Sequence, residues 1–286
     1  IYPRSFADAS GDGIGDLAGI TERLPALREL GVDAVWLSPF FRSPQRDAGY
    51  DVSDYCDVDP IFGTLADFDA LRDRAHDLGL RVIVDLVPNH CSSDHPWFQE
   101  ALAAGPGSPE RDRFMFREGK GENGELPPNN WQSIFGGNAW TRITEADGTP
   151  GPWYLHIFDT SQPDFNWKNP WVWEQFRQIL RFWLDRGVDG FRVDVAHGLM
   201  KKEGLPDIVQ VADAGGIADA ISAPDEVPYW AQPEVHEVYR DWHRVLAEYE
   251  GDRVLCAEAW VEPLAKAALW VRPDEMHQAF NFSYLG

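Results

Sequence analysis

The fold of this chain is decided by the stretch Asp185-Arg186-Gly187-Val188-Asp189-Gly190-Phe191-Arg192-Val193-Asp194. A segment with helical periodicity ends at Gly187, because glycine readily adopts the left-handed conformation that terminates a helix. A short, almost wholly apolar strand follows at once, and the same arrangement occurs at residues 29–37 and 77–85. Such strands are typical of a parallel sheet that is covered on both faces. The alternation of helix and strand therefore predicts an α/β protein.

Apolar residues spaced three or four positions apart identify the helices that precede these strands. They are Leu17, Ile20, Leu24, Leu27 and Leu30 in the first helix, Leu65, Phe68, Leu71, Ala75 and Leu78 in the second, and Trp173, Phe176, Ile179, Leu180 and Trp183 in the third. Thr64 is expected to cap the second helix. Further along, the pattern predicts helices near 233–249 and 262–271 and strands at 253–257 and 276–283.

Two architectures fit this alternation, a doubly wound sheet and a (β/α)8 barrel. The one glycine-rich loop, at residues 11–16, lacks the G-x-G-x-x-G spacing, and its two aspartates would repel a phosphate. Asp85, Asp194 and Glu258 instead stand where strands end, as functional groups do in barrels. We therefore expect an α/β fold of the (β/α)8 TIM barrel type, incomplete, with about strands 1–6.

An unusually long connection separates the second and third of the glycine-terminated units. It is rich in Gly, Pro, Asn and Trp and shows no long helical period. A bare loop of that length is uncommon in a compact protein. We therefore expect a small inserted domain after strand 3. The catalytic barrel would then span 1–90 and 166–286, and the inserted domain, domain B, would span 91–165.

The charge of the chain restricts its partners. With 47 acidic and 25 basic residues the net charge is −22, so we expect no nucleic-acid and no membrane partner, since anionic surfaces would repel it. No stretch approaches the roughly 20 apolar residues that a membrane span needs. The three cysteines are odd in number and far apart, which argues against a disulfide framework and favours the cytoplasm. The oligomeric state is left open.

Two strand-end carboxylates, Asp194 and Glu258, are the candidate catalytic pair. They close adjacent strands, so their side chains are expected to converge. Glycoside hydrolysis uses two carboxyl groups that flank the scissile bond, one ionised and one protonated. Arg192 would hold Asp194 ionised, and the apolar stretch beside Trp260 would raise the pKa of Glu258. The alternative is that both are ordinary ion-paired carboxylates.

Five motifs, in order along the chain, resemble the α-amylase superfamily (glycoside hydrolase family 13), specifically its oligo-1,6-glucosidase and α-glucosidase branch. They are Tyr2-Pro3-Arg4-Ser5-Phe6, Asp85-Leu86-Val87-Pro88-Asn89-His90, Gln162-Pro163-Asp164-Phe165-Asn166-Trp167, Gly190-Phe191-Arg192-Val193-Asp194 and Ala257-Glu258-Ala259-Trp260. The resemblance implies that Asp194 is the nucleophile, that Glu258 is the acid/base and that Arg192 orients Asp194. It also implies that Asp85 supports the end of the third strand and that His90 binds the sugar to be cleaved.

The same resemblance identifies further substrate-binding residues. Tyr50 would stack under the terminal glucose, and Asp47 would bind its far hydroxyls and close the pocket behind it, which makes the enzyme exo-acting. Phe135 and Phe158, from the inserted domain, would line the pocket. The third essential aspartate of the family, the last two β/α units and the C-terminal β-domain would lie beyond residue 286. As an N-terminal fragment, the chain alone is expected to be inactive.

An acidic loop offers oxygen atoms at alternate positions, from Asp8, Ser10, Asp12, the carbonyl of Ile14, and Asp16. The spacing resembles the first part of an EF-hand loop, and hard oxygen ligands favour Ca²⁺ or Mg²⁺. Related enzymes carry such a metal, usually with Asn where this chain has Ser10. We expect a structural Ca²⁺ or Mg²⁺ here and no organic cofactor. A second interpretation, compatible with the first, is that Asp16 caps the helix that follows.

The sequence therefore predicts a retaining, exo-acting α-glucosidase that acts on small α-glucosides of the maltose, isomaltose and sucrose class. A glucosyltransferase or isomerase of the same family (trehalose synthase, sucrose isomerase or amylosucrase type) is the alternative, since it shares most of the motifs. A non-catalytic, transporter-associated relative is disfavoured, because Asp194 and Glu258 are both present. In the branch that the chain resembles, the residue after the nucleophile influences which linkage is cleaved, and Val195 at this position favours α-1,6 bonds. Residues 195–199, however, look more like those of α-1,4-glucosidases, so the linkage is left open.

Overall fold

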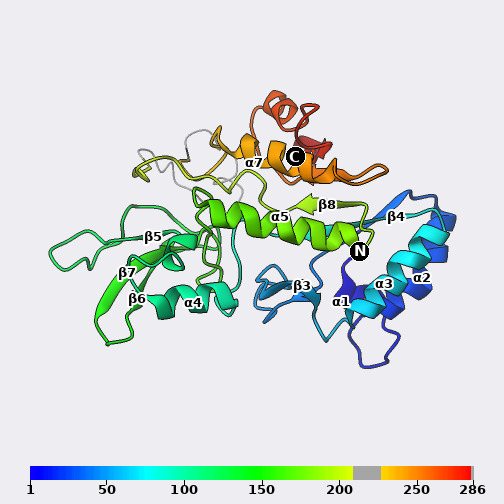
Figure 1. Cartoon of the computed structure of the whole chain (residues 1–286), viewed down its shortest axis with the longest axis horizontal. Helices are drawn as coiled ribbons and strands as arrows, with labels where there is room; N and C mark the ends of the chain where they lie inside the picture. Colours follow the sequence, from blue (N-terminus) through cyan, green and yellow to red (C-terminus); the bar gives the residue numbers. More distant parts are fainter. Residues whose placement is uncertain (209–226, 285–286) are drawn as a thin grey trace.

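The computed structural model describes residues 1–208 and 227–284 of the chain. Its central sheet consists of five parallel strands in the order β1-β4-β8-β9-β10, of which β4 and β8 are labelled in Figure 1. Their bounds are Ala34–Leu37 (β1), Arg81–Leu86 (β4), Gly190–Val193 (β8), Val254–Ala257 (β9) and Gln278–Ala279 (β10). The predicted parallel sheet is confirmed. The predicted length of the last strand, 276–283, is wrong, because the chain turns into the 3₁₀-helix Phe282–Tyr284 soon after β10.

The first residue of the chain extends the sheet at its β1 edge. The amino group of Ile1 donates to the carbonyl of Trp36 over 2.6 Å, and the N–H of Ser38 donates to the carbonyl of Ile1 over 3.0 Å. These two bonds continue the hydrogen-bond ladder of the sheet.

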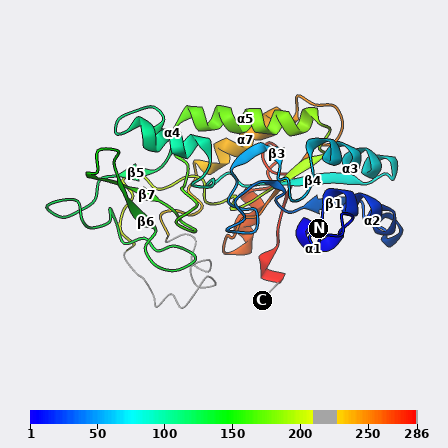
Figure 2. The ribbon, with the colours of Figure 1, turned by 90° about the horizontal axis from the view of Figure 1, so that it is seen from below.

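Helices pack against the central sheet. They are α2 (Leu17–Leu30), α3 (Leu65–Asp77), α5 (Pro170–Asp185) and α7 (Val235–Leu246), whereas the short α1 (Pro3–Phe6) contacts α2. Helix α2 lies beside α3, and α5 beside α7, as Figures 1 and 2 show. Thr64 caps α3 in a capping box with Asp67, as predicted. Among the described helices, none combines the length and the apolar composition that a membrane crossing requires.

The prediction of a helix near 262–271 is wrong in type. The chain forms the 3₁₀-helix η2, Leu264–Leu269, directly after Pro263. None of the residues of η2 is buried, so no apolar face is available to stabilise a regular α-helix by packing.

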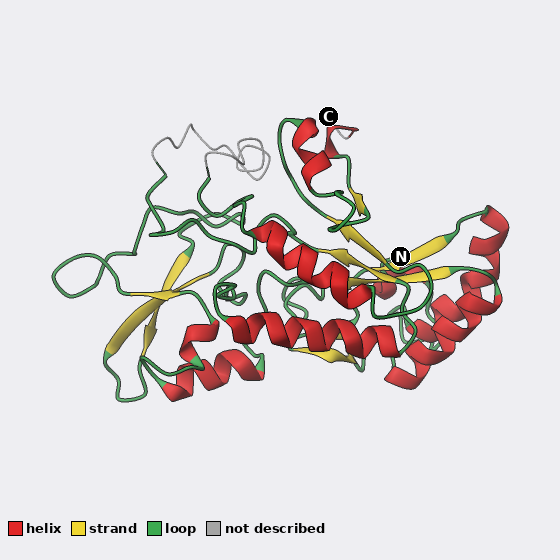
Figure 3. Ribbon diagram, turned by 45° about the horizontal axis from the view of Figure 1, so that its top comes forward, coloured by secondary structure: helices red, strands yellow, loops and turns green. Residues whose placement is uncertain are grey.

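Between β4 and α5 the chain forms a separate layer of structure. It contains α4 (Pro96–Ala104), the 3₁₀-helix η1 (Arg111–Arg113), and a three-stranded antiparallel sheet in the order β5-β7-β6. The strands are Phe116–Arg117 (β5), Trp140–Thr144 (β6) and Pro150–Leu155 (β7). This sheet lies away from the central one, at the left of Figure 3. The division of the chain at residues 90 and 165 stays a prediction.

Two apolar clusters fill the interior. The larger one lies between the central sheet and its helices. The smaller one surrounds Trp131 and Trp140, which are fully buried. A short antiparallel pair, β2 (Phe41–Arg42) and β3 (Asp54–Val58), follows β1 and carries the loop of Asp47 between its strands.

Candidate active site

The carboxyl ends of three neighbouring strands bring the predicted catalytic residues together. Asp85 lies near the end of β4, Asp194 follows β8 and Glu258 follows β9. Arg192 of β8 donates through Nη1 to Asp85 Oδ1 over 2.9 Å and to Asp194 Oδ1 over 2.6 Å. Its Nη2 lies 2.9 Å from Glu258 Oε2. One buried guanidinium is therefore shared by three carboxylates.

This arrangement determines the protonation of the cluster. One guanidinium cannot neutralise three carboxylates, so the cluster favours the uptake of a proton. Burial raises the pKa of Asp194 well above its ordinary value, the charge of Glu258 raises it further, and Arg192 opposes both. Burial also raises the pKa of Asp85 to about 7. The Arg192 guanidinium lies 2.6 Å from Asp194, as the prediction that it keeps Asp194 ionised requires, and the ionisation itself stays a prediction. Carboxyl groups this close together titrate as a unit and not one by one.

Asp85 is fully buried and receives hydrogen bonds from several donors. Its Oδ2 accepts from Trp36 Nε1 over 3.0 Å and from the Tyr50 hydroxyl over 3.3 Å. The guanidinium of Arg192 lies over the Trp36 ring, 4.9 Å from its centre. Asp85 is therefore held between Trp36, Tyr50 and Arg192. Trp36, on β1, is a site residue that the sequence analysis missed.

Two donors orient the carboxyl group of Glu258. The N–H of Val195 donates to Oε2 over 2.9 Å, and Trp260 Nε1 donates to Oε1 over 3.3 Å. Val195 adopts a φ of 46°, which is strained for a β-branched residue. Backbone strain of this kind is concentrated at functional sites, and here it lies directly after Asp194.

Asp47, His90 and Gln162 form a second polar group. Gln162 Nε2 donates to Asp47 Oδ2 over 2.8 Å and lies 3.2 Å from His90 Nε2. Burial raises the pKa of Asp47 and lowers the pKa of His90 to about 4, so the imidazole is neutral at pH 7. The structure brings Asp47 and His90 together through Gln162. The sequence analysis quoted this glutamine within a motif but gave it no role.

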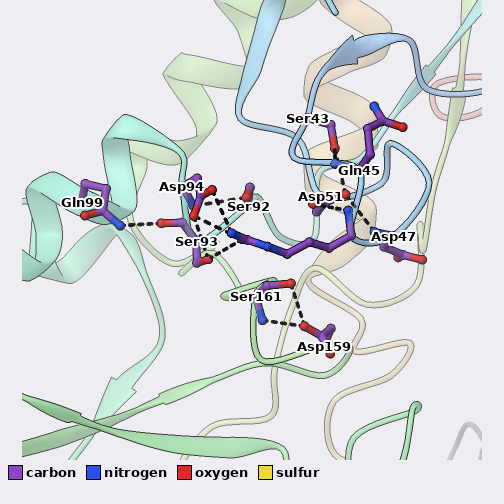
Figure 4. A network of polar contacts seen from close by, with 11 residues as sticks. Ser43, Gln45, Asp47, Asp51, Ser92, Ser93, Asp94, Gln99, Asp159 and Ser161 are labelled. Atoms are coloured by element: carbon purple, nitrogen blue, oxygen red, sulfur yellow. Dashed lines mark hydrogen bonds and ion pairs between the residues drawn. The ribbon is translucent and has the colours of Figure 1, made fainter. Parts of the chain in front are cut away.

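Buried Asp51 holds the loop that carries Asp47. Asp51 Oδ1 accepts from the N–H of Asp47 over 3.0 Å and from the Ser43 hydroxyl over 2.8 Å (Figure 4). Asp51 Oδ2 accepts the N–H of Arg46 over 3.0 Å. The guanidinium of Arg46 then reaches Asp94, 3.0 Å away, just ahead of α4. The loop is anchored at both ends, which fixes the position of the Asp47 carboxylate.

A cavity of about 220 Å³ opens beside Glu258. Its other lining residues include Phe135, Phe158, Val195, His197, Trp230 and Trp260. Phe158 packs against His90 with ring centres 5.0 Å apart, and Phe135 packs against Phe158 at 5.7 Å. Both predicted aromatic residues of the inserted segment therefore lie at the site. The sequence analysis gave no role to His197 or Trp230.

A buried ion pair joins the loops behind the site. Lys201 Nζ lies 2.8 Å from Asp164 Oδ2 and donates to Asn89 Oδ1 over 2.8 Å. Asn89 Nδ2 in turn donates to Asp164 over 3.1 Å. The side chains of Lys201 and Asp164 are 2% and 0% exposed, so each charge depends on the other. The pair holds the loop after β8 against the end of the inserted segment.

The acidic loop at residues 8–16 is closed by its own hydrogen bonds. Asp8 accepts backbone N–H groups of this loop over 2.6 and 2.8 Å, and Asp12 accepts one over 2.8 Å. Asp16 accepts the N–H of Gly19 over 2.6 Å, which confirms that it caps α2. Within residues 1–208 and 227–284, no three His, Cys, Asp or Glu side chains are arranged to hold a metal ion. The oxygen ligands suit a hard cation, but the carboxylates do not converge as placed. The metal site stays a prediction.

Comparison with known proteins relates this site to others. A family model described as "Alpha amylase, catalytic domain" matches residues 1–285. The chain is 45% identical over 288 residues to an oligo-1,6-glucosidase of Parageobacillus thermoglucosidasius, a match that covers 100% of this chain and 48% of the relative. It is 50% identical over 240 residues to a probable alpha-glucosidase of Rhizobium meliloti (strain 1021), covering 84% of this chain and 42% of that protein.

Two solved structures share the fold along the whole chain. A trehalose-6-phosphate hydrolase from Bacillus licheniformis superposes with a TM-score of 0.88 at 37% identity, covering 100% of this chain and 48% of that one. The trehalulose synthase MutB from Pseudomonas mesoacidophila MX-45 superposes with a TM-score of 0.87 at 38% identity, covering 99% and 48%. The chain spans about half the length of these relatives.

Proposed function

The chain belongs to the alpha-amylase family through its catalytic domain, and on this premise we propose that the full-length protein containing it is a retaining, exo-acting α-glucosidase. Its substrates are small α-glucosides of the maltose, isomaltose and sucrose class. The observation that carries the proposal is the pair Asp194 and Glu258, which meet at Arg192 on the carboxyl ends of adjacent strands. The activity is proposed for the full-length protein, because the chain spans about half the length of its relatives.

In the proposed mechanism, Asp194 attacks the anomeric carbon while Glu258 donates a proton to the departing oxygen. The glycosidic C–O bond breaks and a glucosyl ester forms on Asp194. Glu258, now ionised, takes a proton from water, and this water cleaves the ester so that glucose is released in the α-configuration. Arg192 balances charge on both carboxylates throughout.

A fluorinated glucosyl donor that traps the ester tests this mechanism in the full-length protein. We expect the covalent label on Asp194 and α-glucose as the first product. A label on another residue, or β-glucose as the first product, would contradict the mechanism.

Product analysis distinguishes hydrolysis from glucosyl transfer. Maltose, isomaltose, sucrose and trehalose are supplied separately, and the sugars formed are identified. Release of free glucose supports the proposed hydrolase. Accumulation of isomeric disaccharides would instead assign the chain to the transferase and isomerase type, of which the trehalulose synthase is a structural neighbour.

Replacement of Asp47 by alanine is expected to lower kcat/KM on maltose at least tenfold, about 1.4 kcal/mol. The half-buried Asp47 carboxylate, held by Gln162, is placed to accept hydrogen bonds from the far hydroxyls of a terminal glucose. The wild type should release glucose from maltotriose and leave soluble starch almost untouched. The matched control is Asp57→Ala, which removes a carboxylate from a surface ion pair with Arg42. Rapid internal cleavage of starch by the wild type would overturn exo-action.

We also propose that the loop at residues 8–16 binds Ca²⁺ or Mg²⁺ and stabilises the fold. Chelator should then lower the melting temperature of the full-length protein by roughly 3–8 °C. Asp12→Ala should abolish this effect, because it removes one ligand. Asp147→Ala serves as the control, since Asp147 also accepts a backbone N–H in its own turn but lies outside the loop. An unchanged melting curve in chelator would exclude a stabilising metal here.

We propose a cytoplasmic location on the basis of the three cysteines. Cys56, Cys91 and Cys256 are free. Burial raises the pKa of Cys56 to about 12 and that of Cys256 to about 11, so neither forms a thiolate readily at neutral pH. Unpaired thiols suit a reducing compartment. Fractionation of cells that express the full-length protein checks the location.

A further inference from the structure

A second cavity, of about 410 Å³, lies between α7 and η2 and is called the α7–η2 cavity below. It shares no lining residue with the cavity beside Glu258. Neighbouring residues of the chain separate the two, because Trp230 and Trp260 line the cavity beside Glu258, whereas Ala231 and Val261 line the α7–η2 cavity. The α7–η2 cavity is therefore distinct from the candidate active site.

The wall of the α7–η2 cavity is positively charged. Arg240, Lys266 and Arg272 line it together with His236, and no carboxylate is found among the described residues of this wall. The chain as a whole has 47 acidic and 25 basic residues, so a wall with three permanent cations and no acid runs against its composition. Such a wall creates a local positive potential that attracts anions.

A buried carboxylate beneath the wall fixes the cations in position. Glu275 is 0% exposed, and its Oε2 lies 2.7 Å from His236 Nδ1. Its Oε1 lies 2.9 Å from Arg240 Nη2 and 2.5 Å from Arg272 Nη2. Long basic side chains that are already held in place lose less conformational entropy when a ligand binds to them. The cationic wall is therefore preorganised.

The two arginines differ in what they can offer a ligand. Arg240 uses all three guanidinium nitrogens, because it also pairs with Glu237 and, over 3.2 Å, with Asp274. Arg272 pairs with Glu275 through Nη2, and 37% of its side chain is exposed. A guanidinium has five N–H donors, so this pair leaves further donors on an accessible side chain. Arg272 is therefore the arginine that can bind an anion.

The remaining wall and the size of the cavity narrow the class of anion. Arginine binds phosphate through two parallel hydrogen bonds, and lysine binds it as a point charge. A phosphate monoester carries nearly two negative charges at neutral pH, which matches Arg272 and Lys266, whereas a carboxylate carries one. Val261, Leu269 and Trp270 add apolar surface. The volume falls in the range of roughly 300–1,000 Å³ that small organic ligands occupy.

We propose that the α7–η2 cavity binds a small organic phosphate, with Arg272 and Lys266 on the phosphate group and the apolar wall against the organic part. This site does not depend on the proposed glucosidase function, because it shares no residue with the cavity beside Glu258.

Isothermal titration calorimetry with phenyl phosphate, on the full-length protein at constant ionic strength, tests the proposal. We expect one phenyl phosphate to bind per chain, in the millimolar range or tighter. Phenol, which lacks the phosphate group, should not bind measurably. Inorganic phosphate should bind more weakly than phenyl phosphate, because it makes no contact with the apolar wall. Tighter binding of benzoate than of phenyl phosphate would overturn the assignment to phosphate.

Two variants locate the binding. Arg272→Gln keeps a long polar side chain and removes the charge, so the affinity for phenyl phosphate should fall about tenfold or more. Lys266→Gln should lower it about threefold or more, and it leaves the ion pairs of buried Glu275 intact. The matched control is Arg244→Gln, because Arg244 also lies on α7 but is 68% exposed, pairs with Asp241 and does not line the cavity. Its affinity should equal that of the wild type.

Three outcomes would overturn the inference while the glucosidase function stands. They are the absence of saturable binding in the wild type, an affinity that neither Arg272→Gln nor Lys266→Gln changes, and displacement of phenyl phosphate by glucose, which would place the ligand beside Glu258.

Discussion

Replacement of Asp194 by asparagine in the full-length protein is expected to lower kcat on maltose by roughly 10⁴-fold or more. Asparagine keeps the shape of the side chain and its place at the end of β8. It cannot form a glucosyl ester, because the amide is not a nucleophile. Arg192 would still pair with Asp85 and Glu258, so the fold around the site should survive. A circular-dichroism melt close to that of the wild type would show that the loss lies in the chemistry.

Azide provides a sharper readout for the same pair of residues. In Asp194→Asn, azide should attack the sugar directly and give an inverted glucosyl azide. In Glu258→Gln, azide should resolve the ester and give a retained glucosyl azide. The control is Asp241→Asn, since Asp241 lies on α7 in an ion pair with Arg177 and should leave activity within twofold. Full activity of Asp194→Asn would remove this residue from the mechanism.

Replacement of His95 by asparagine should make the protein more resistant to acid, by roughly 2 kcal/mol between pH 6.5 and pH 4.5. His95 lies among the rings of Tyr55 and Trp97, with centres 5.7 and 4.3 Å from its own. Burial lowers its pKa from 6.5 to about 3. The unfolded chain therefore binds a proton below pH 6.5 that the folded chain does not bind. The free energy of unfolding falls as the pH drops, and asparagine removes this dependence.

Asparagine is the matched replacement because it preserves the helix cap. His95 Nδ1 accepts the N–H of Trp97 over 3.1 Å at the start of α4, and an asparagine side chain is a good acceptor at this position. Urea midpoints of both proteins are measured from pH 7.5 to pH 4.5. Protonation of Asp85 and Asp194, whose pKa values are raised, changes the stability in the opposite direction, but it does so equally in both proteins. The difference between the two urea midpoints therefore reports on His95. Parallel curves across this range would refute the prediction.

The fold could be predicted from the sequence where local signals determine it. Glycine at the ends of the first helices, followed by apolar runs, locates β1, β4 and β8, and the match to the alpha-amylase catalytic domain and its structural relatives confirms an incomplete TIM barrel. The 3₁₀ form of η2 was not predictable, because it depends on the absence of a buried face rather than on composition. The short β10 was likewise not predictable, because the strand is interrupted by the 3₁₀-helix that follows it.

The site could be predicted where strand topology alone brings residues together. Asp194, Glu258 and Arg192 meet because the carboxyl ends of adjacent parallel strands lie at one edge. Gln162 could not be paired with Asp47 in this way, since 115 residues separate them and the contact depends on the folded inserted segment. The same holds for His197 and Trp230. The sequence also does not show that one arginine serves three carboxylates.

The buried pair of Lys201 and Asp164 has a consequence for how such proteins diversify. Asp164 lies at the end of the inserted segment, while Lys201 lies in the loop after β8, and Asn89 binds both. A hybrid protein can receive the inserted segment of this chain without a lysine that matches Lys201. The carboxylate of Asp164 is then buried without an ion-pair partner. The segment is therefore not a free module. Hybrids that exchange the segment without a matching lysine should therefore fail at folding.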